Sequence, residues 1–187
     1  ELKCKSDVCV TSSNAVKIVK ALPNKNIFFI PDHNLGSFVA EQVPEKNIIL
    51  NDGCCPIHAK ITATQVYAER EKHPEAEVLT HPECDASVIE LSDYLGSTAD
   101  IIAYAKNSDV SEFIICTEDG VDFKLITDNP DKRFYYPNPH PCCADMKLNT
   151  LAAVLSVLEK EDKEVTVDED IRRRARIPLD RMLELAK

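Results

Sequence analysis

The chain has 187 residues, of which 44% are hydrophobic and 29% charged, and these values are ordinary for a globular protein with a substantial core. Its formal net charge of −10 argues against nucleic acid as the main partner, because phosphate binding needs a basic surface. No apolar run approaches the ~20 residues of a membrane-spanning helix and no secretory leader is recognisable, so we expect a cytoplasmic protein without a membrane partner.

The apolar periodicities predict helices and strands that alternate along the chain. In chain order we expect a helix at residues 16–22, a strand at 26–30, a helix at 35–42, a strand at 47–50, a helix at 64–73 and a strand at 77–80. There follow helices at 86–91 and 98–106, a strand at 112–116, a helix at 121–127, a strand at 133–136, a helix at 148–158 and a short strand at 165–167.

A final helical region begins at Asp168, which is a suitable cap. We expect Pro178 to restart this helix at a first-turn position, followed by a buried stripe of Leu179, Met182, Leu183 and Leu185. The alternation as a whole is typical of α/β layers with parallel sheets and right-handed crossovers. A domain boundary is predicted near residues 74–80, and residues 137–147 are predicted to link the second domain to a helical tail.

Three predicted strands end in an acidic step that precedes a helix. These steps are Ile30-Pro31-Asp32, His81-Pro82-Glu83 and Cys116-Thr117-Glu118. Ligands of open α/β sheets bind at the carboxyl ends of the strands, so these positions are candidates for a site. The four glycines form neither a dinucleotide fingerprint nor a phosphate-binding loop, and we therefore do not expect a nucleotide enzyme of the usual kind.

The eight cysteines include two adjacent pairs, Cys54-Cys55 and Cys142-Cys143, each in a loop after a predicted strand. Neither pair has the spacing of a locally assembled zinc site. Separate thiolates such as Cys55 and Cys143 suit an iron–sulfur cluster or a redox pair formed in space. The alternative is that they are inert packing cysteines.

Two histidines and a carboxylate follow predicted strands and could move protons. His58 lies three residues after Cys55, and His81 and Glu83 flank a proline. Imidazole and carboxylate groups are the usual general acids and bases. In the alternative interpretation, His58 caps a local turn and Glu83 or Asp85 caps the next helix, and we take Cys84 to be structural.

Two hydroxyl-rich turns precede predicted helices, Thr11-Ser12-Ser13-Asn14 and Gly96-Ser97-Thr98. Each is explained by ordinary capping. Free amides and hydroxyls at a helix N-terminus also bind carboxylate or phosphate, and the presence of two such turns favours a small anionic substrate.

Several of these motifs, in this order, resemble those of the quinolinate synthase family of NAD biosynthesis. The resemblance runs along nearly the whole chain and includes Thr11-Ser12-Ser13-Asn14-Ala15, Pro31-Asp32-His33-Asn34-Leu35-Gly36, Cys55-Pro56-Ile57-His58, His81-Pro82-Glu83-Cys84, Gly96-Ser97-Thr98, Thr117-Glu118, Cys143-Ala144-Asp145-Met146-Lys147 and Pro178-Leu179-Asp180-Arg181-Met182-Leu183.

The resemblance implies a fold of three pseudo-symmetric three-layer αβα domains with parallel sheets. Residues 1–76 and 77–147 would be the second and third domains. Residues 148–187 would be a C-terminal helical tail that packs on the first domain, which the resemblance places before Glu1.

The resemblance also implies a 4Fe-4S cluster that acts as a Lewis acid, with Cys55 and Cys143 as two of its three ligands and the third in the first domain. The implied reaction condenses iminoaspartate with dihydroxyacetone phosphate to give quinolinate, phosphate and water. His58, His81 and Glu83 match catalytic positions, while Ser12, His81, Glu83 and Thr98 match substrate-binding positions.

The implied supplier of iminoaspartate is L-aspartate oxidase or aspartate dehydrogenase. The oligomeric state stays open, with a homodimer as one form. Two other interpretations of the residues themselves also stay open. One is a non-catalytic α/β binding module with structural cysteines, and the other is an enzyme in which His58 activates Cys55 as a nucleophile.

Overall fold

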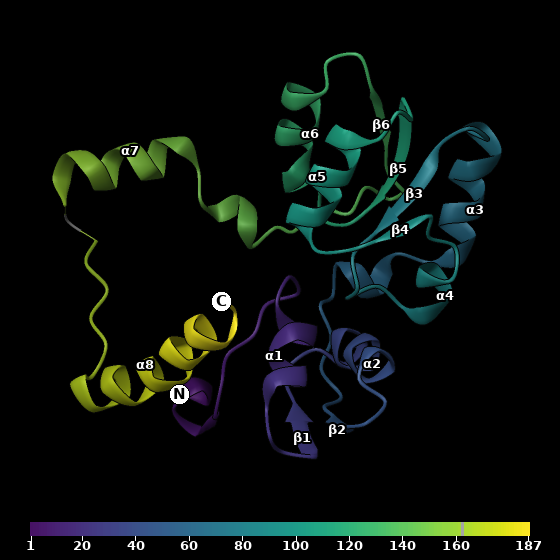
Figure 1. Ribbon diagram of the computed structural model, residues 1–187. Coiled ribbons are helices and arrows are strands. Elements are labelled where there is room, and N and C mark those ends of the chain that lie inside the picture. Colours follow the sequence, from purple (N-terminus) through teal and green to yellow (C-terminus); the bar gives the residue numbers. More distant parts are fainter. Residues whose placement is uncertain (162) are drawn as a thin grey trace. The chain divides into compact units, whose positions relative to one another are not determined.

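The computed structural model describes residues 1–161 and 163–187 (Figure 1). The chain forms two compact units. The first unit combines residues 1–21 with residues 143–187, and the second unit is the continuous stretch of residues 22–142. Among the described residues, no helix is both long enough and apolar enough to cross a membrane.

The second unit begins with a pair of parallel strands joined by a helix. Strand β1 (Asn26–Phe29) pairs with β2 (Asn47–Leu50), and α2 (His33–Gln42) connects them. Gly36 lets this helix approach the strands, because a Cβ at that position would lie 2.7 Å from Cδ2 of Leu50. Both strands and the helix agree with the sequence prediction.

A four-stranded parallel sheet forms the rest of this unit, in the order β4-β3-β5-β6. Its strands are β3 (Glu77–Thr80), β4 (Tyr94–Leu95), β5 (Glu112–Cys116) and β6 (Arg133–Tyr135). The central strands β3 and β5 are apolar on both faces, as expected for a parallel sheet between helices. The predicted α/β class with parallel sheets is therefore confirmed.

Helices cover both faces of this sheet (Figure 1). One face packs against α3 (Ala63–Lys72) and α4 (Ala86–Ile89), and the other packs against α5 (Thr98–Asn107) and α6 (Asp122–Asp128). The short 3-10 helices η2 (His58–Lys60) and η3 (Asp119–Val121) lie in the loops after β2 and β5. The layers therefore hold the carboxyl ends of the central strands in a fixed position.

The first unit is helical. It contains the 3-10 helices η1 (Leu2–Lys5) and η4 (Met146–Leu148) and the helices α1 (Ala15–Ala21), α7 (Leu151–Lys160) and α8 (Glu169–Leu185). The N-terminal segment is hydrogen-bonded to α8, since the Cys4 thiol donates to the carbonyl of Ile171 at 3.3 Å. Lys17 likewise donates to the carbonyl of Ala186 at 2.8 Å.

Two sequence predictions in the C-terminal part are wrong. Residues 165–167 are not a strand, and Val165 is 86% exposed. A strand needs a neighbouring strand to pair with, and in the described part of the chain this segment pairs with none.

Pro178 does not restart a helix, because α8 runs through it without a break. Pro178 is buried and its carbonyl accepts a hydrogen bond from the Cys9 amide at 3.0 Å, contacts that offset the cost of proline inside a helix.

Two further predictions need adjustment. The sequence predicted no strand between residues 91 and 98, where the two-residue strand β4 lies. The predicted buried stripe of α8 is only partly covered, since Leu183 is 59% exposed. The predicted division at residues 76 and 77 falls inside the second unit, between the two sheets, and the division into three parts stays a prediction.

Candidate active site at the strand ends

The central strands β3 and β5 bring two polar segments to the same edge of the sheet. Thr80 pairs with Cys116 at the ends of the two strands, so His81 and Thr117 follow side by side. The amide of His81 donates a hydrogen bond to the carbonyl of Cys116 at 3.1 Å and ties the two ends together. The parallel arrangement therefore turns two distant stretches of sequence into neighbours.

A third segment, the loop after β2, joins this edge. Gly53 passes so close to another loop that a Cβ there would lie 2.6 Å from the carbonyl oxygen of Pro31. The buried carboxylate of Asp32 then accepts two hydrogen bonds, one from the amide of Leu35 at 2.8 Å and one from the amide of Cys55 at 2.7 Å. Asp32 thus caps α2 and fixes the loop that carries Cys55.

His58 is the centre of the resulting cluster. Its Nδ1 lies 3.1 Å from Oε2 of Glu83, close enough for a charge interaction although poorly aligned for a hydrogen bond. Its Nε2 lies 2.9 Å from Oγ1 of Thr117. His58 is only 6% exposed, so both contacts are shielded from water. The Glu83 carboxylate, which the sequence placed beside His81, therefore faces His58.

His81 stacks on His58, with ring centroids 4.5 Å apart and planes 19° from parallel. Burial, and secondly the neighbouring His58, lower the pKa of His81 to about 4, although the Glu83 charge acts in the opposite direction. His81 is thus neutral at neutral pH. Its Nδ1 accepts a hydrogen bond from the Glu83 amide at 3.2 Å, which leaves the proton on Nε2.

The carboxylate of Glu83 is held in its charged form. The side-chain contact with His58 is the main cause that lowers the pKa of Glu83, and partial burial opposes it. The backbone of this residue is also fixed, because the side-chain amide of Asn34 donates to the carbonyl of Glu83 at 2.9 Å. The alternative in which Glu83 caps α4 does not apply, because the side chain of Asp85 accepts the hydrogen bond from the amide of Ser87.

Among the described residues, two groups of side chains could hold a metal ion. The ligand atoms of Cys55, His58 and Glu83 lie within 4.8 Å of one another, and so do those of the group Glu118, Asp119 and Cys142. Cys55 is half-buried at the strand ends and supplies the soft sulfur donor that an iron–sulfur cluster uses. Cys84 is unsuited to that role, since burial raises its pKa strongly, and this agrees with its predicted structural role.

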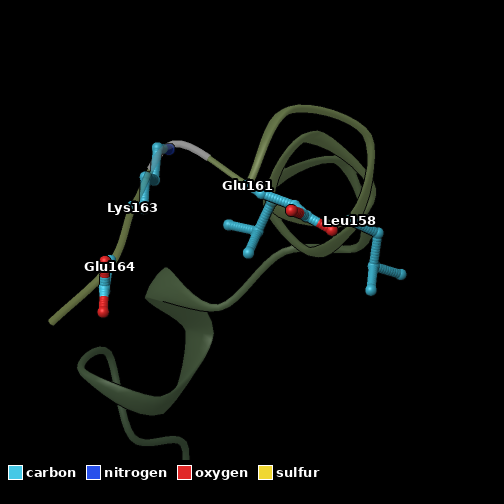
Figure 2. Close-up of a pocket in the computed structure, with 5 residues that line it drawn as sticks. Leu158, Glu161, Lys163 and Glu164 are labelled. Carbon is cyan, nitrogen blue, oxygen red and sulfur yellow. The ribbon is translucent and has the colours of Figure 1, made fainter.

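Two hollows in the described part of the chain differ in the side chains that line them. The first, of about 190 Å³, adjoins the candidate site in the second unit and is lined by Ile57, Lys60, Ile61, Pro139, His140, Pro141 and Cys142. The second lies beside the end of α7 in the first unit, where Figure 2 shows Leu158, Glu161, Lys163 and Glu164 around it. Its lining combines exposed aliphatic and charged side chains and contains neither cysteine nor histidine. Of these two hollows, the first is therefore the one that lies beside reactive groups.

Comparison with protein families shows the family of the chain. The family described as "Quinolinate synthetase A protein" matches residues 1–184. The chain belongs to the quinolinate synthetase A family. This family is one of enzymes, since its members are named synthetases or synthases of quinolinate.

Three curated relatives named "Quinolinate synthase" show how much of the quinolinate synthetase A family the chain represents. The protein of Caldicellulosiruptor saccharolyticus is 50% identical over 185 residues, which are 99% of this chain and 61% of that protein. The protein of Alkaliphilus metalliredigens is 45% identical, with the same two coverages. That of Clostridioides difficile is 44% identical over 100% of this chain and 62% of its own length. The chain thus spans about three fifths of the length of these relatives.

The resemblance to the quinolinate synthase family predicted a set of site residues, and the structure brings four of them together. Cys55, His58, His81 and Glu83 converge at the strand ends of the second unit. Thr98 is in the same unit and is exposed in the first turn of α5, which follows the strand beside β3.

The other two predicted site residues belong to the first unit. Ser12 is half-buried in the turn before α1, where the Thr11 amide donates to Oδ1 of Asn14 at 2.7 Å. Cys143 is also half-buried, and its carbonyl accepts a hydrogen bond from the Lys147 amide at 3.2 Å. The functional roles of all seven residues stay predictions.

Sequence reasoning missed two members of the site. Thr117, which contacts His58, and Asp32, which holds the Cys55 loop, were noted as parts of strand-end steps and of motifs that carry the resemblance, but were given no role. The signal was their position directly after buried strands. Their partners could not be inferred, because the contacts join residues 59 and 23 positions apart in the sequence.

Proposed function

We propose that the chain is the greater part of a quinolinate synthase that works in the cytoplasm. In this proposal the whole protein condenses iminoaspartate with dihydroxyacetone phosphate and releases quinolinate, phosphate and water. The observation that supports it best is the convergence of Cys55, His58, His81 and Glu83 at one sheet edge in a chain of this family. Imidazole and carboxylate groups can carry out the proton transfers that condensation and dehydration require.

The state of each side chain suggests its role. Glu83 is a carboxylate in contact with an imidazole, so the pair formed with His58 can accept and return a proton. His81 is neutral and carries its proton on Nε2, so it can donate a hydrogen bond to a substrate oxygen without adding charge. We assign substrate binding to Ser12, Thr98, His81 and Glu83, and the hydroxyls of Ser12 and Thr98 and the Nε2–H of His81 are the donors among them that suit the substrate carboxylates and phosphate.

Cys55 and Cys143 would hold a 4Fe-4S cluster together with a cysteine from the remainder of the whole protein. When bound, the cluster would supply a Lewis acid that polarises substrate oxygen or nitrogen. Cys55 suits this role because its loop is fixed by the Asp32 carboxylate. The neighbouring Cys54 is exposed and serves as a natural control.

The remaining features of the proposal concern organisation and partners. Residues 1–76 and 77–147 would be two of three similar domains, and residues 148–187 a tail that packs on the domain outside this chain. Iminoaspartate is formed by oxidation of aspartate, so L-aspartate oxidase or aspartate dehydrogenase would supply it. The whole protein could act as a homodimer.

The first test measures iron and acid-labile sulfide after anaerobic reconstitution of the chain together with the unmatched segment of the Caldicellulosiruptor saccharolyticus relative. We expect about four iron and four sulfide per chain. The substitutions Cys55→Ser and Cys143→Ser should abolish binding, whereas the adjacent Cys54→Ser and Cys142→Ser should retain it. Unchanged iron content in Cys55→Ser would contradict the cluster assignment and favour a binding module with structural cysteines.

A second test measures quinolinate formation by the same reconstituted protein. Glu83→Gln keeps the shape of the side chain but removes its charge, so we expect kcat to fall about 10²–10⁴-fold. Asp85→Asn, at the exposed N-cap of α4, should leave kcat unchanged. Full activity of Glu83→Gln would remove this carboxylate from the mechanism.

A further inference from the structure

The two-stranded sheet β1-β2 repeats the geometry of the strand pair β5-β6. The paired residues Asn26 and Asn47 lie 21 positions apart in the sequence. Glu112 and Arg133, which pair in β5-β6, have the same separation. In both pairs a helix, α2 or α6, joins the two parallel strands, and two adjacent cysteines follow the second strand. Residue by residue, β1 therefore corresponds to β5, and β2 corresponds to β6.

Hydrogen bonds outside the strands follow the same correspondence. They tie the helix start to the cysteine loop, and the lysine before the second strand to the segment before the first. The matching bonds are those from the His33 amide to the Gly53 carbonyl (2.6 Å) and from the Asp119 amide to the Pro141 carbonyl (2.9 Å), and those from Lys46 Nζ to the Asn24 carbonyl (3.1 Å) and from Lys132 Nζ to the Ala105 carbonyl (2.7 Å). The stretches β1-α2-β2 and β5-α6-β6 are thus two copies of one β-α-β motif.

The two copies differ in what covers one of their faces. In the β5-β6 copy, Ile114 is fully buried and Tyr135 is half-buried against the cluster that α3 and α4 complete. Their counterparts in the other copy are Phe28, which is 62% exposed, and Ile49, which is 49% exposed. Phe28 and Ile49 pair across the two strands and so form one apolar patch. The opposite face of β1 is covered, since Phe29 is only 5% exposed.

The edge of β1 differs from that of β5 in the same way. Strand β5 lies between β3 and β6, whereas β1 pairs with β2 alone in the part of the chain that the structure describes. An edge strand presents a row of amides and carbonyls that a further strand can join. In the β5-β6 copy this place belongs to β3, in which Val78 pairs with Ile114, and the helices beside β3 cover the face. One further strand with a flanking helix would therefore fill both the edge and the patch.

We infer that the edge of β1 and the patch of Phe28 and Ile49 bind a parallel strand and an adjoining apolar helix from the part of the whole protein that lies outside this chain. The chain covers 61% of the Caldicellulosiruptor saccharolyticus relative, so the remainder is long enough to supply both elements. A second copy of the chain suits the edge less well. Two β1 strands joined about a two-fold axis perpendicular to the sheet would run antiparallel, whereas the counterpart edge of β5 takes a parallel strand.

This inference goes beyond the proposed function and does not depend on the reaction assigned there. It means that residues 1–76 form only part of a domain, which the remainder of the whole protein completes. The loop of Cys55 follows β2, so the same strand addition would stabilise the sheet that carries this loop.

The test compares hydrogen–deuterium exchange, followed by mass spectrometry, in two samples. One is the chain alone, and the other is the chain co-expressed with the unmatched segment of the Caldicellulosiruptor saccharolyticus relative. We expect the amides of β1 to exchange about tenfold more slowly or less in the second sample, because an edge strand gains a second row of hydrogen bonds. Strand β5 is the matched control, since it is paired on both sides in the chain alone and its exchange should change little.

A pair of variants tests the patch. Phe28→Asp places a charge on the surface that the helix would cover, so the segment should no longer co-purify with the chain. Phe123→Asp, at a position of α6 that is 80% exposed, should retain the segment. Loss of the segment in both variants, or in neither, would contradict the assignment of this patch. If Phe28→Asp does not fold, exchange in the unsubstituted chain decides.

Three results of the exchange experiment would overturn the inference. The first is slow exchange of β1 in the chain alone, which would mean that its own residues or a second copy cover the edge. The second is a bound segment that leaves the exchange of β1 unchanged, and the third is no association with the segment. If the segment protects β1 but no quinolinate forms, the proposed function fails and this interaction surface stands.

Discussion

The strand-end cluster of the second unit and helix α7 of the first unit are opposites in the burial of their side chains. His58, His81 and Thr117 are polar, yet they are buried and contact one another or their neighbours. Helix α7 is apolar, yet Leu151 is 90% exposed and Leu158 is 72% exposed.

The difference shows which part of the chain is complete in itself. The second unit has a sheet covered on both faces, and the buried polar groups at its strand ends contact partners within the same unit. Helix α7 presents an apolar face that the described part of the chain does not cover, and an isolated helix of its length is marginal in water. The stability of the chain should therefore depend on the second unit far more than on α7.

The largest effect is expected at Phe113, which is fully buried in β5 and stacks on Phe134 with ring centroids 5.8 Å apart. Phe113→Ala should lower the free energy of unfolding by about 3–5 kcal/mol, because it removes buried apolar surface and leaves a cavity. Urea denaturation followed by circular dichroism measures this. A loss below about 1 kcal/mol would mean that this sheet is not the stabilising core.

Acid should destabilise the second unit through His81. Its pKa of about 4 in the folded state lies below the ordinary value of 6.5, so the unfolded chain binds the proton more readily between these two pH values. Stability is fully present above about pH 6.5 and falls by about 1.4 kcal/mol per pH unit down to about pH 4, about 3 kcal/mol in all.

Urea denaturation at a series of pH values measures this slope. His81→Gln should reduce it, whereas His33→Gln, at an exposed position, should retain it. An equal slope in His81→Gln and the unsubstituted chain would contradict the buried neutral state of His81.

Asp32→Ala should have a smaller effect on stability and a specific effect on Cys55. Loss of the cap on α2 should cost about 1–2 kcal/mol, and the Cys55 loop should lose its anchor. We expect faster alkylation of Cys55, measured by mass spectrometry of the digested protein. Asp85→Ala removes the cap of α4 but lies outside the Cys55 loop, so Cys55 should react there at the unsubstituted rate. Equal alkylation rates in the two variants would disprove the anchoring role.

The smallest effect is expected in α7. Leu155 is 56% exposed, so Leu155→Ser should change the free energy of unfolding by less than about 0.5 kcal/mol. Leu125→Ser, at a fully buried position of α6, is the matched control and should cost several times more. If Leu155→Ser is as damaging as Leu125→Ser, α7 is covered in solution and the contrast between the two regions is lost.

The fold class was predictable because helix and strand periodicity is local. Each of β1, β2, β3 and β5 lies within one residue of its predicted range, since apolar runs of four or five residues bounded by turns leave few alternatives. The strand expected at residues 165–167 failed for the opposite reason. Its valines have strand propensity, but pairing depends on a neighbour that local sequence does not specify.

The sequence by itself determined the α/β architecture, the family and most of the polar residues gathered at the strand ends. Only the tertiary structure decided their partners: the Glu83 carboxylate faces His58, Thr117 contacts the other side of the same ring, and Asp32 holds the amide of Cys55. The physical reason is that sheet order and loop path set these contacts across tens of residues. The side-chain chemistry can be read locally, but the protonation state of a buried imidazole depends on which groups surround it.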